Sequence, residues 1–193
     1  MLPAQHHEVP RTPLLALPPT SDHLDALGVS MRPVGACDLP FLRRLYHSFR
    51  TEELALVPWT PARKAWFLDD QFRLQHADWS RRYAGADFLV VERKGAPYQA
   101  RAPIGRLYLD RTAMVWRIVD IGLTPSARGA GVGAALLEWV QSAARHAGAA
   151  RVDLQVLLAN PRAQALYRRL GFQITGDDGA RLAMVWTAPP GVS

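Results

Sequence analysis

Three glycines alternate in the stretch SARGAGVGAALLEW, residues 126–139, directly before a run with helical periodicity. A helix that begins within glycines offers unpaired backbone N–H groups and the positive end of its dipole, and together these bind phosphate. Glycine lets the backbone approach a pyrophosphate closely because no Cβ stands in the way. A tight strand-to-helix turn alone needs fewer glycines. The stretch therefore predicts a site for a phosphate-bearing ligand.

The glycine run is no P-loop, because no Lys-Ser or Lys-Thr pair follows it. A dinucleotide fold fits better: Gly129, Gly131 and Ala134 satisfy G-x-G-x-x-A, and Asp153 stands near the offset of a ribose-binding acid. However, residues 124–128 separate the glycines from the preceding strand, and Asp153 lies near the start of its own strand. The motif also leaves little chain for further strand–helix units. An NAD-binding oxidoreductase stays as an alternative.

The elements around the glycines predict one α/β (α+β) domain. Periodicity indicates strands at 29–34, 87–93, 104–111, 114–123, 151–158, 172–175 and 180–186, and helices at 36–49, 60–79, 131–146 and 161–170. The nearly continuous apolar run at 114–123 is typical of a sheet centre. Long hairpins imply antiparallel pairs, and strand–helix–strand from 114 to 158 implies a parallel pair. We predict a mixed, mostly antiparallel sheet of six to seven strands flanked by about four helices.

The length of 193 residues and the apolar content of 49% suit one well-buried domain. We expect that domain at 29–188, with a flexible Pro-rich arm at 1–28 and a short tail at 189–193. No apolar run reaches the ~18–20 residues that cross a bilayer, and the N-terminus lacks a secretory signal. The single Cys37 cannot form an internal disulfide. We therefore expect a cytoplasmic protein with no membrane contact.

The net charge of +6 is carried almost entirely by arginine, since Lys64 and Lys94 are the only lysines. A basic surface steers anionic ligands, either a phosphorylated cofactor or nucleic acid. The arginines are spread along the chain and form no basic block with interleaved aromatics. We therefore favour a phosphorylated cofactor and do not expect nucleic acid as a partner.

A second motif follows the glycines, and the two motifs together resemble a known family. DIGLTPSARGAGVGAALL, residues 120–137, is followed by a strand and then by NPRAQALYRRLGF, residues 160–172. They resemble the GNAT superfamily of acyl-CoA-dependent N-acyltransferases, with its R-x-x-G-x-G/A pattern at Arg128, Gly131 and Gly133 and its N…A…LY-x-x-x-GF signature. The resemblance follows the order of elements through most of the chain and is strong across the two motifs.

The resemblance implies acetyl-CoA as co-substrate and a GNAT-like fold. Backbone groups of the glycine loop would hold the pyrophosphate, at Arg128, Gly129, Ala130, Gly131, Val132, Gly133 and Ala134. The strand ending at Leu123 and Thr124 would splay from the next strand, so that pantetheine pairs with the backbone of Ile121 and Leu123. A backbone N–H there would stabilise a developing oxyanion.

The resemblance implies that two residues of the second motif also contact the cofactor. Asn160 resembles the residue whose side-chain amide contacts the cofactor arm, but it is equally suited to cap a helix that starts at Pro161. Arg162 would reach a phosphate, and its alternative is a solvated side chain on the first turn.

Tyr167 matches the family tyrosine that protonates the departing thiolate. A phenol with a pKa of about 10 is protonated at neutral pH, although an aromatic at this spacing also suits the core. An ammonium acceptor must also lose a proton, and where many members carry a carboxylate this chain has Arg117. Asp120 is the only carboxylate in that strand. We expect it to be the base or a water-positioning residue, or else the partner of Arg117 or Arg106.

The acceptor pocket of the family is usually built between the first two helices. Candidate contacts there are Glu52, Glu53, Trp59, Gln71 and Gln75. An acidic pair suits a cationic amine, although a solvated turn explains the two glutamates equally well. His76 is a further candidate base, with a surface position as its alternative.

The sequence thus predicts an N-acetyltransferase that moves an acetyl group from acetyl-CoA to a primary amine of a small molecule or peptide. We expect direct attack in a ternary complex, because Cys37 is the only thiol and lies far from the motifs. We expect no metal, and a monomer or homodimer. Alternatives are a non-catalytic acyl-CoA-binding module, which Arg117 favours, and then the oxidoreductase.

Overall fold

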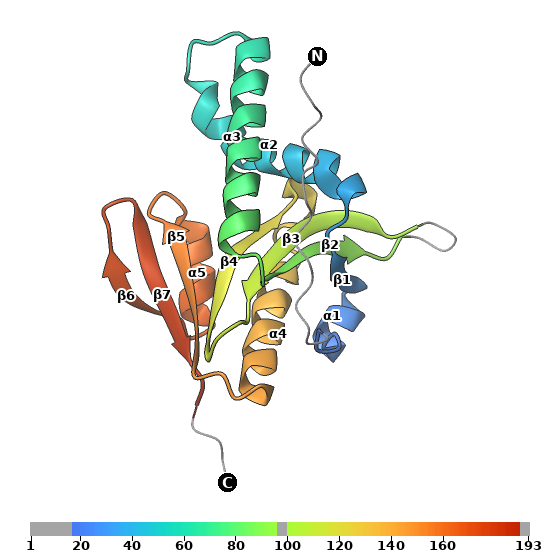
Figure 1. Ribbon diagram of the computed structural model, residues 1–193, viewed down its shortest axis with the longest axis vertical. Helices are drawn as coiled ribbons and strands as arrows, with labels where there is room; N and C mark the ends of the chain where they lie inside the picture. The colour runs from blue at the N-terminus through green and yellow to red at the C-terminus, as the bar shows by residue number, and fades with distance from the viewer. Residues whose placement is uncertain (1–16, 96–99, 190–193) are drawn as a thin grey trace.

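Seven strands form one sheet in the order β1-β2-β3-β4-β5-β7-β6 (Figure 1). The computed structural model describes residues 17–95 and 100–189. The strands are β1 (Val29–Pro33), β2 (Asp87–Arg93), β3 (Ala102–Asp110), β4 (Val115–Leu123), β5 (Arg151–Leu157), β6 (Gln173–Asp177) and β7 (Arg181–Thr187). All neighbours are antiparallel except β4 and β5, which are parallel. The predicted mixed sheet and the central place of β4 are confirmed.

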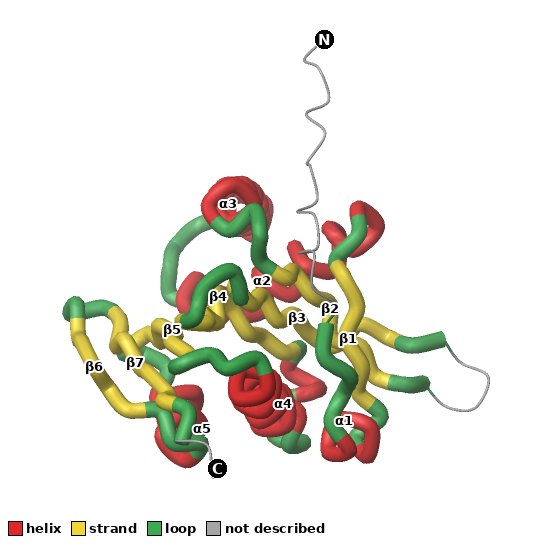
Figure 2. Tube along the Cα trace, turned by 60° about the horizontal axis from the view of Figure 1, so that its bottom comes forward, coloured by secondary structure: helices red, strands yellow, loops and turns green. Residues whose placement is uncertain are grey.

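Helices cover both faces of the sheet, as predicted (Figure 2). They are α1 (Asp22–Ala26), α2 (Leu39–Ala55), α3 (Pro61–Arg82), α4 (Val132–His146) and α5 (Pro161–Arg169). Alternate side chains of β2 enter opposite cores: Val90 packs with α2 and α3, whereas Leu89 packs with α1 and α4. We call the first side the α2–α3 face and the second the α4 face. In the described ranges, no helix combines the length and apolar character needed to span a membrane.

Helix α1 lies within the segment for which the sequence predicts a flexible arm. Its N-cap Ser21 accepts a hydrogen bond from the backbone N–H of Leu24, and the Leu24 side chain is fully buried on the α4 face. The Trp139 indole of α4 also donates to the carbonyl of Pro19. The prediction of an arm is therefore wrong for residues 17–28, because one buried leucine in a five-residue helix leaves no periodicity to detect. Residues 1–16 lie outside the described part.

The two helices of the α2–α3 face differ from their predicted ranges at the helix ends. Thr60 caps α3, because its hydroxyl accepts from the N–H of Arg63 at 3.3 Å. The side chain of Asp38 does not cap α2 but accepts from the N–H of Gly35 and pairs with Arg32. Helix α2 continues to Ala55, beyond the predicted end at 49.

Candidate active site

Strands β4 and β5 pair over four residues and then separate. Their parallel register runs from Val115 opposite Arg151 to Ile118 opposite Leu154. On its other edge β4 stays paired with β3 as far as Leu123. Within the described residues, the C-terminal half of β4 therefore has an edge toward β5 that is paired with no strand.

The backbone groups of Ile121 and Leu123 point into this gap. Thr124 donates its N–H to the carbonyl of Ile104 at 2.8 Å, so Thr124 turns its backbone groups toward β3. In an antiparallel pair this orientation alternates, and Gly122 therefore also faces β3. Ile121 and Leu123 then face away from β3, as the resemblance implies. An extended chain in the gap can pair with them as an added strand does.

The glycine run forms the turn from β4 into α4, next to the end of the gap. Gly129 and Gly131 have φ angles of 81° and 79°, in the left-handed region that favours glycine. Gly131 is the N-cap of α4 and has no side chain to satisfy the first N–H groups of the helix. Residues 128–131 are exposed, so the loop that leads into the helix N-terminus is open to a ligand anion.

Arginine side chains flank the loop on two sides. A Cβ added at Gly129 would lie 3.4 Å from the Arg162 guanidinium, so this side chain of α5 reaches the loop. Arg128 turns back to donate its Nε–H to the carbonyl of Leu123 at 3.1 Å. Asn160 accepts from the N–H of Ala163 at 3.1 Å and so caps α5, which was the alternative to a cofactor contact. Its contact with a cofactor stays a prediction.

Tyr167 is buried in α5, with 7% of its surface exposed. Its ring lies 5.8 Å from the Phe172 ring, so the core packing weighed as an alternative is present. Burial raises the pKa of the Tyr167 hydroxyl, and the negative charge of Asp120 raises it further. Both causes favour the protonated phenol, which is the form that donates a proton. Packing and proton donation are therefore compatible at this position.

Asp120 pairs with Arg106, one of the two partners expected for it. Arg106 Nε donates to Asp120 Oδ2 at 2.5 Å, and the Arg106 side chain is 3% exposed against 24% for Asp120. The guanidinium lies 5.4 to 5.7 Å from the rings of Phe49, Trp79 and Tyr108. Burial opposes its charge, but Asp120, with smaller contributions from Tyr108 and Tyr46, more than offsets this and the pKa of Arg106 is raised.

Arg117 takes a different partner. Its guanidinium binds both carboxylate oxygens of Asp153, at 3.0 and 2.7 Å, across the parallel pair of β4 and β5. The acid that the dinucleotide alternative assigned to a ribose is therefore held in an ion pair within the sheet.

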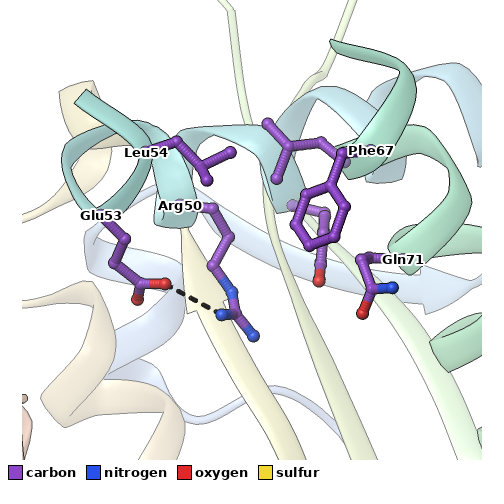
Figure 3. A pocket seen from close by; sticks show the side chains of 7 residues that line it. Arg50, Glu53, Leu54, Phe67 and Gln71 are labelled. Carbon is purple, nitrogen blue, oxygen red and sulfur yellow. Dashed lines mark hydrogen bonds and ion pairs between the residues drawn. The ribbon is translucent and has the colours of Figure 1, made fainter. Parts of the chain in front are cut away.

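A small hollow separates α2 from α3 (Figure 3). Its volume is about 50 Å³. It is lined by Tyr46, Arg50, Glu53, Leu54, Phe67, Leu68 and Gln71. Arg50 and Glu53 form an ion pair at 2.9 Å, so Glu53 of the expected acidic pair already has a cationic partner. Both glutamates lie in the last turns of α2 and not in a turn between helices.

The other predicted acceptor residues lie around this hollow and do not line it. The Trp59 ring packs edge-on against Phe67 at 5.3 Å. Glu52 is exposed on α2, and Gln75 is half-buried on α3. His76 is buried and stacks on Phe72 at 5.6 Å, so its expected surface position is wrong. In residues 17–95 and 100–189, no cluster of three His, Cys, Asp or Glu side chains is placed to hold a metal ion.

Sequence reasoning missed two residues of this site, Arg106 and Phe49. The sequence suggested Arg106 only as a partner for Asp120. Arg106 and Tyr108 are two residues apart in one strand, so both side chains lie on the same face of the sheet. Phe49 is the last residue of the helix predicted at 36–49 and had no role in the predicted site. Its contact with β4 joins residues far apart in sequence, and no local signal carries it.

Comparison with known proteins assigns the class. The model of the acetyltransferase (GNAT) family matches residues 44–172, more than half of the chain. This chain belongs to that family. Among solved structures, PaiA N-acetyltransferase from Thermoplasma acidophilum, in complex with coenzyme A, has a TM-score of 0.61 at 18% identity and covers 82% of this chain and 98% of its own.

Two other solved structures have the same fold at similar distance. Spermidine N-acetyltransferase from Vibrio cholerae, in complex with CoA and spermine, has a TM-score of 0.57 at 18% identity, over 83% of this chain and 96% of its own. Ard1 from Thermoplasma volcanium has a TM-score of 0.55 at 20% identity, over 84% and 99%. At these identities the likeness shows the fold.

Proposed function

We propose that this protein transfers an acetyl group from acetyl-CoA to a primary amine of a small molecule or peptide. The single observation that carries the proposal is the gap between β4 and β5. It has the glycine turn at one end and Asp120 on its β4 edge, and the charge of Asp120 helps to raise the pKa of the buried Tyr167. Acetyl-CoA supplies the activated acetyl group when it is bound.

The α4 face fits the phosphate-bearing arm of such a cofactor. The backbone N–H groups of residues 128–134 bind the pyrophosphate, and Arg162 adds positive charge beside Gly129. Ile121 and Leu123 hydrogen-bond to pantetheine through the backbone groups that face the gap, and one N–H stabilises the developing oxyanion. Asn160 contacts the cofactor arm through the amide nitrogen that helix capping leaves unused.

Proton transfers are assigned to Tyr167 and Asp120. The Tyr167 hydroxyl protonates the thiolate as it leaves. Arg106 holds Asp120 Oδ2, and we assign Oδ1 to the proton that the acceptor ammonium loses, directly or through one water. The acceptor enters from the α2–α3 face at the hollow lined by Glu53 and Gln71, and Glu52, Trp59 and Gln75 of the same two helices and their connection are further contacts. The amine then attacks the thioester directly, without an acyl-enzyme.

The solved structures support an amine as the acceptor. One of the similar proteins is a spermidine N-acetyltransferase bound to CoA and spermine, which is a small-molecule amine. A second candidate function, a non-catalytic acyl-CoA-binding module, is favoured by one observation. Arg117 replaces the family's usual carboxylate, and the remaining carboxylate of β4, Asp120, is already paired.

Release of CoA from acetyl-CoA across a panel of amines tests the proposal. The panel holds polyamines, amino-sugar antibiotics, lysine peptides and peptides with free N-termini. We expect at least one amine to release CoA above the rate without amine. Thermal unfolding with CoA or NAD is the control: CoA raises the midpoint in both candidate functions, whereas NAD does so only for a dehydrogenase. Stabilisation by CoA without transfer to any amine would favour the binding module.

A further inference from the structure

The Phe49 ring of α2 lies directly on β4 at Gly122. A Cβ added at Gly122 would be 2.9 Å from Phe49 Cε2 and would overlap the ring further at Cζ. Glycine at this position therefore lets an aromatic ring touch the strand backbone. Gly122 stands between Ile121 and Leu123, whose backbone groups face the gap. The ring is thus in contact with the part of β4 where the thioester is proposed to lie.

Two guanidinium groups hold this ring in place. The Arg106 guanidinium carbon lies 5.7 Å from the Phe49 ring centre, and that of Arg128 lies 5.5 Å from it. Arg106 is fixed by Asp120, and Arg128 is fixed by the carbonyl of Leu123. Cation–π contacts of this kind stabilise the ring in this position. Phe49 therefore forms a wall that touches β4 at Gly122.

The Phe49 ring lies on the face of the sheet opposite to the glycine turn. The glycine turn leads into α4, which packs on the α4 face, whereas Phe49 comes from α2 on the opposite face. With the thioester beside Ile121 and Leu123, as proposed above, an acyl chain carried by the cofactor would end near Gly122. Beyond its carbonyl carbon it would meet the Phe49 ring that lies on Gly122.

We infer that Phe49 closes the end of the acyl pocket and restricts the donor to short acyl groups such as acetyl. The inference rests on the proposed function, because it takes acyl-CoA as the ligand of the gap. It assigns specificity for the acyl donor to a residue of the face that otherwise receives the acceptor.

Binding of CoA thioesters by isothermal titration calorimetry tests this without any acceptor. Acetyl-CoA, butyryl-CoA and free CoA are titrated into the wild type, Phe49→Ala and Phe49→Leu. In the wild type we expect butyryl-CoA to bind on the order of tenfold more weakly than acetyl-CoA, because two further CH₂ groups have no apolar space. In Phe49→Ala the two affinities should come within about twofold, and Phe49→Leu should lie between.

Phe41→Ala is the matched control, because it removes the same ring from α2 itself, eight residues before Phe49, at a buried position of the α2–α3 core that does not line the hollow. It should keep the wild-type ratio of the two affinities. Thermal unfolding verifies that each variant is folded.

A folded Phe49→Ala or Phe49→Leu with the wild-type ratio would overturn the inference alone. So would an equal change for both thioesters and free CoA, which would mean that Phe49 affects the whole cofactor site. Absence of CoA binding by the wild type would instead overturn the proposed function, so the two failures are distinguishable.

Discussion

The two faces of the sheet build their halves of the site from different parts of the chain. On the α4 face, the glycine turn and the free edge of β4 present backbone N–H and C=O groups. On the α2–α3 face, the site consists of side chains. Arg106 pairs with Asp120 among aromatic rings, and Arg50 pairs with Glu53 beside a small hollow.

This difference has consequences for what each face tolerates. Backbone groups bind phosphate or pantetheine whatever the neighbouring side chains are, provided that no Cβ blocks them. Buried charges are stable only as long as each keeps its partner. The α4 face should therefore be sensitive to added atoms, and the α2–α3 face to removed charges. The four predictions below test this contrast, in order of decreasing effect.

Tyr167→Phe tests the one side chain of the α4 face to which we assign chemistry. Removing the hydroxyl should lower kcat on the order of 10²- to 10⁴-fold, because the thiolate leaves without a proton. Affinity for CoA, measured by calorimetry, should stay the same. Since burial raises the pKa of Tyr167, the activity should show no loss from this group up to about pH 10. Unchanged kcat in the variant would remove the assigned role.

Asp120→Asn and Arg106→Met test the buried pair of the α2–α3 face. Asp120→Asn leaves a guanidinium that is almost fully buried without a counter-charge and should cost about 3–5 kcal/mol of unfolding free energy. Arg106→Met leaves a carboxylate that water partly reaches, so its cost should be smaller. Urea unfolding measures both. Equal losses, or a larger loss in Arg106→Met, would contradict the burial difference between the partners.

Gly131→Ala tests the backbone site of the α4 face. At a φ of 79° an added Cβ strains the loop backbone that we propose binds the pyrophosphate, so CoA binding should weaken on the order of tenfold or more as the charge-assisted hydrogen bonds lengthen. Gly148→Ala is the matched control at the other end of α4, where φ is also positive, at 71°, and nothing lies within 4 Å of an added Cβ. Both variants should lose similar stability, but only Gly131→Ala should lose affinity for CoA.

Asp38→Asn tests a smaller ion pair at the start of α2. The hydrogen bond from Arg32 lowers the pKa of Asp38 in the folded state. Its stabilisation is therefore complete above the unfolded value of about 3.9 and is lost as the pH falls through the folded value. At pH 7 the variant should be less stable by on the order of 1–2 kcal/mol, and this difference should shrink below pH 4. A difference that persists at acidic pH would exclude the carboxylate as its cause.

The same contrast explains what the sequence could predict. Glycines at 129 and 131 and the apolar run of β4 are local patterns, so the sheet, its parallel pair and the loop follow from them. Tyr167 was found because it lies in the second motif, at a fixed distance from Asn160. Each of these signals lies within one stretch of chain.

The α2–α3 face depends on contacts between distant stretches. Phe49 meets Gly122 and Arg106 meets Trp79 only after α2 and α3 have packed on the sheet. Sequence distance hides such pairs. The ion pair of Glu53 with Arg50 is local to α2, and it was missed because the predicted helix ended at 49. The five residues of α1 were missed for a related reason, since Leu24 is buried by tertiary contacts and not by a helical repeat.

A single-turnover experiment with acetyl-CoA labelled in the acetyl group tests the central claim most directly. The protein is mixed with labelled acetyl-CoA and an amine found active in the panel, and the label is followed by mass spectrometry. Our account predicts that the label moves to the amine as one equivalent of CoA appears, with none retained on the protein. Two results would contradict direct transfer in a ternary complex. One is label that stays in acetyl-CoA although the protein has bound it, and the other is label that accumulates on Cys37.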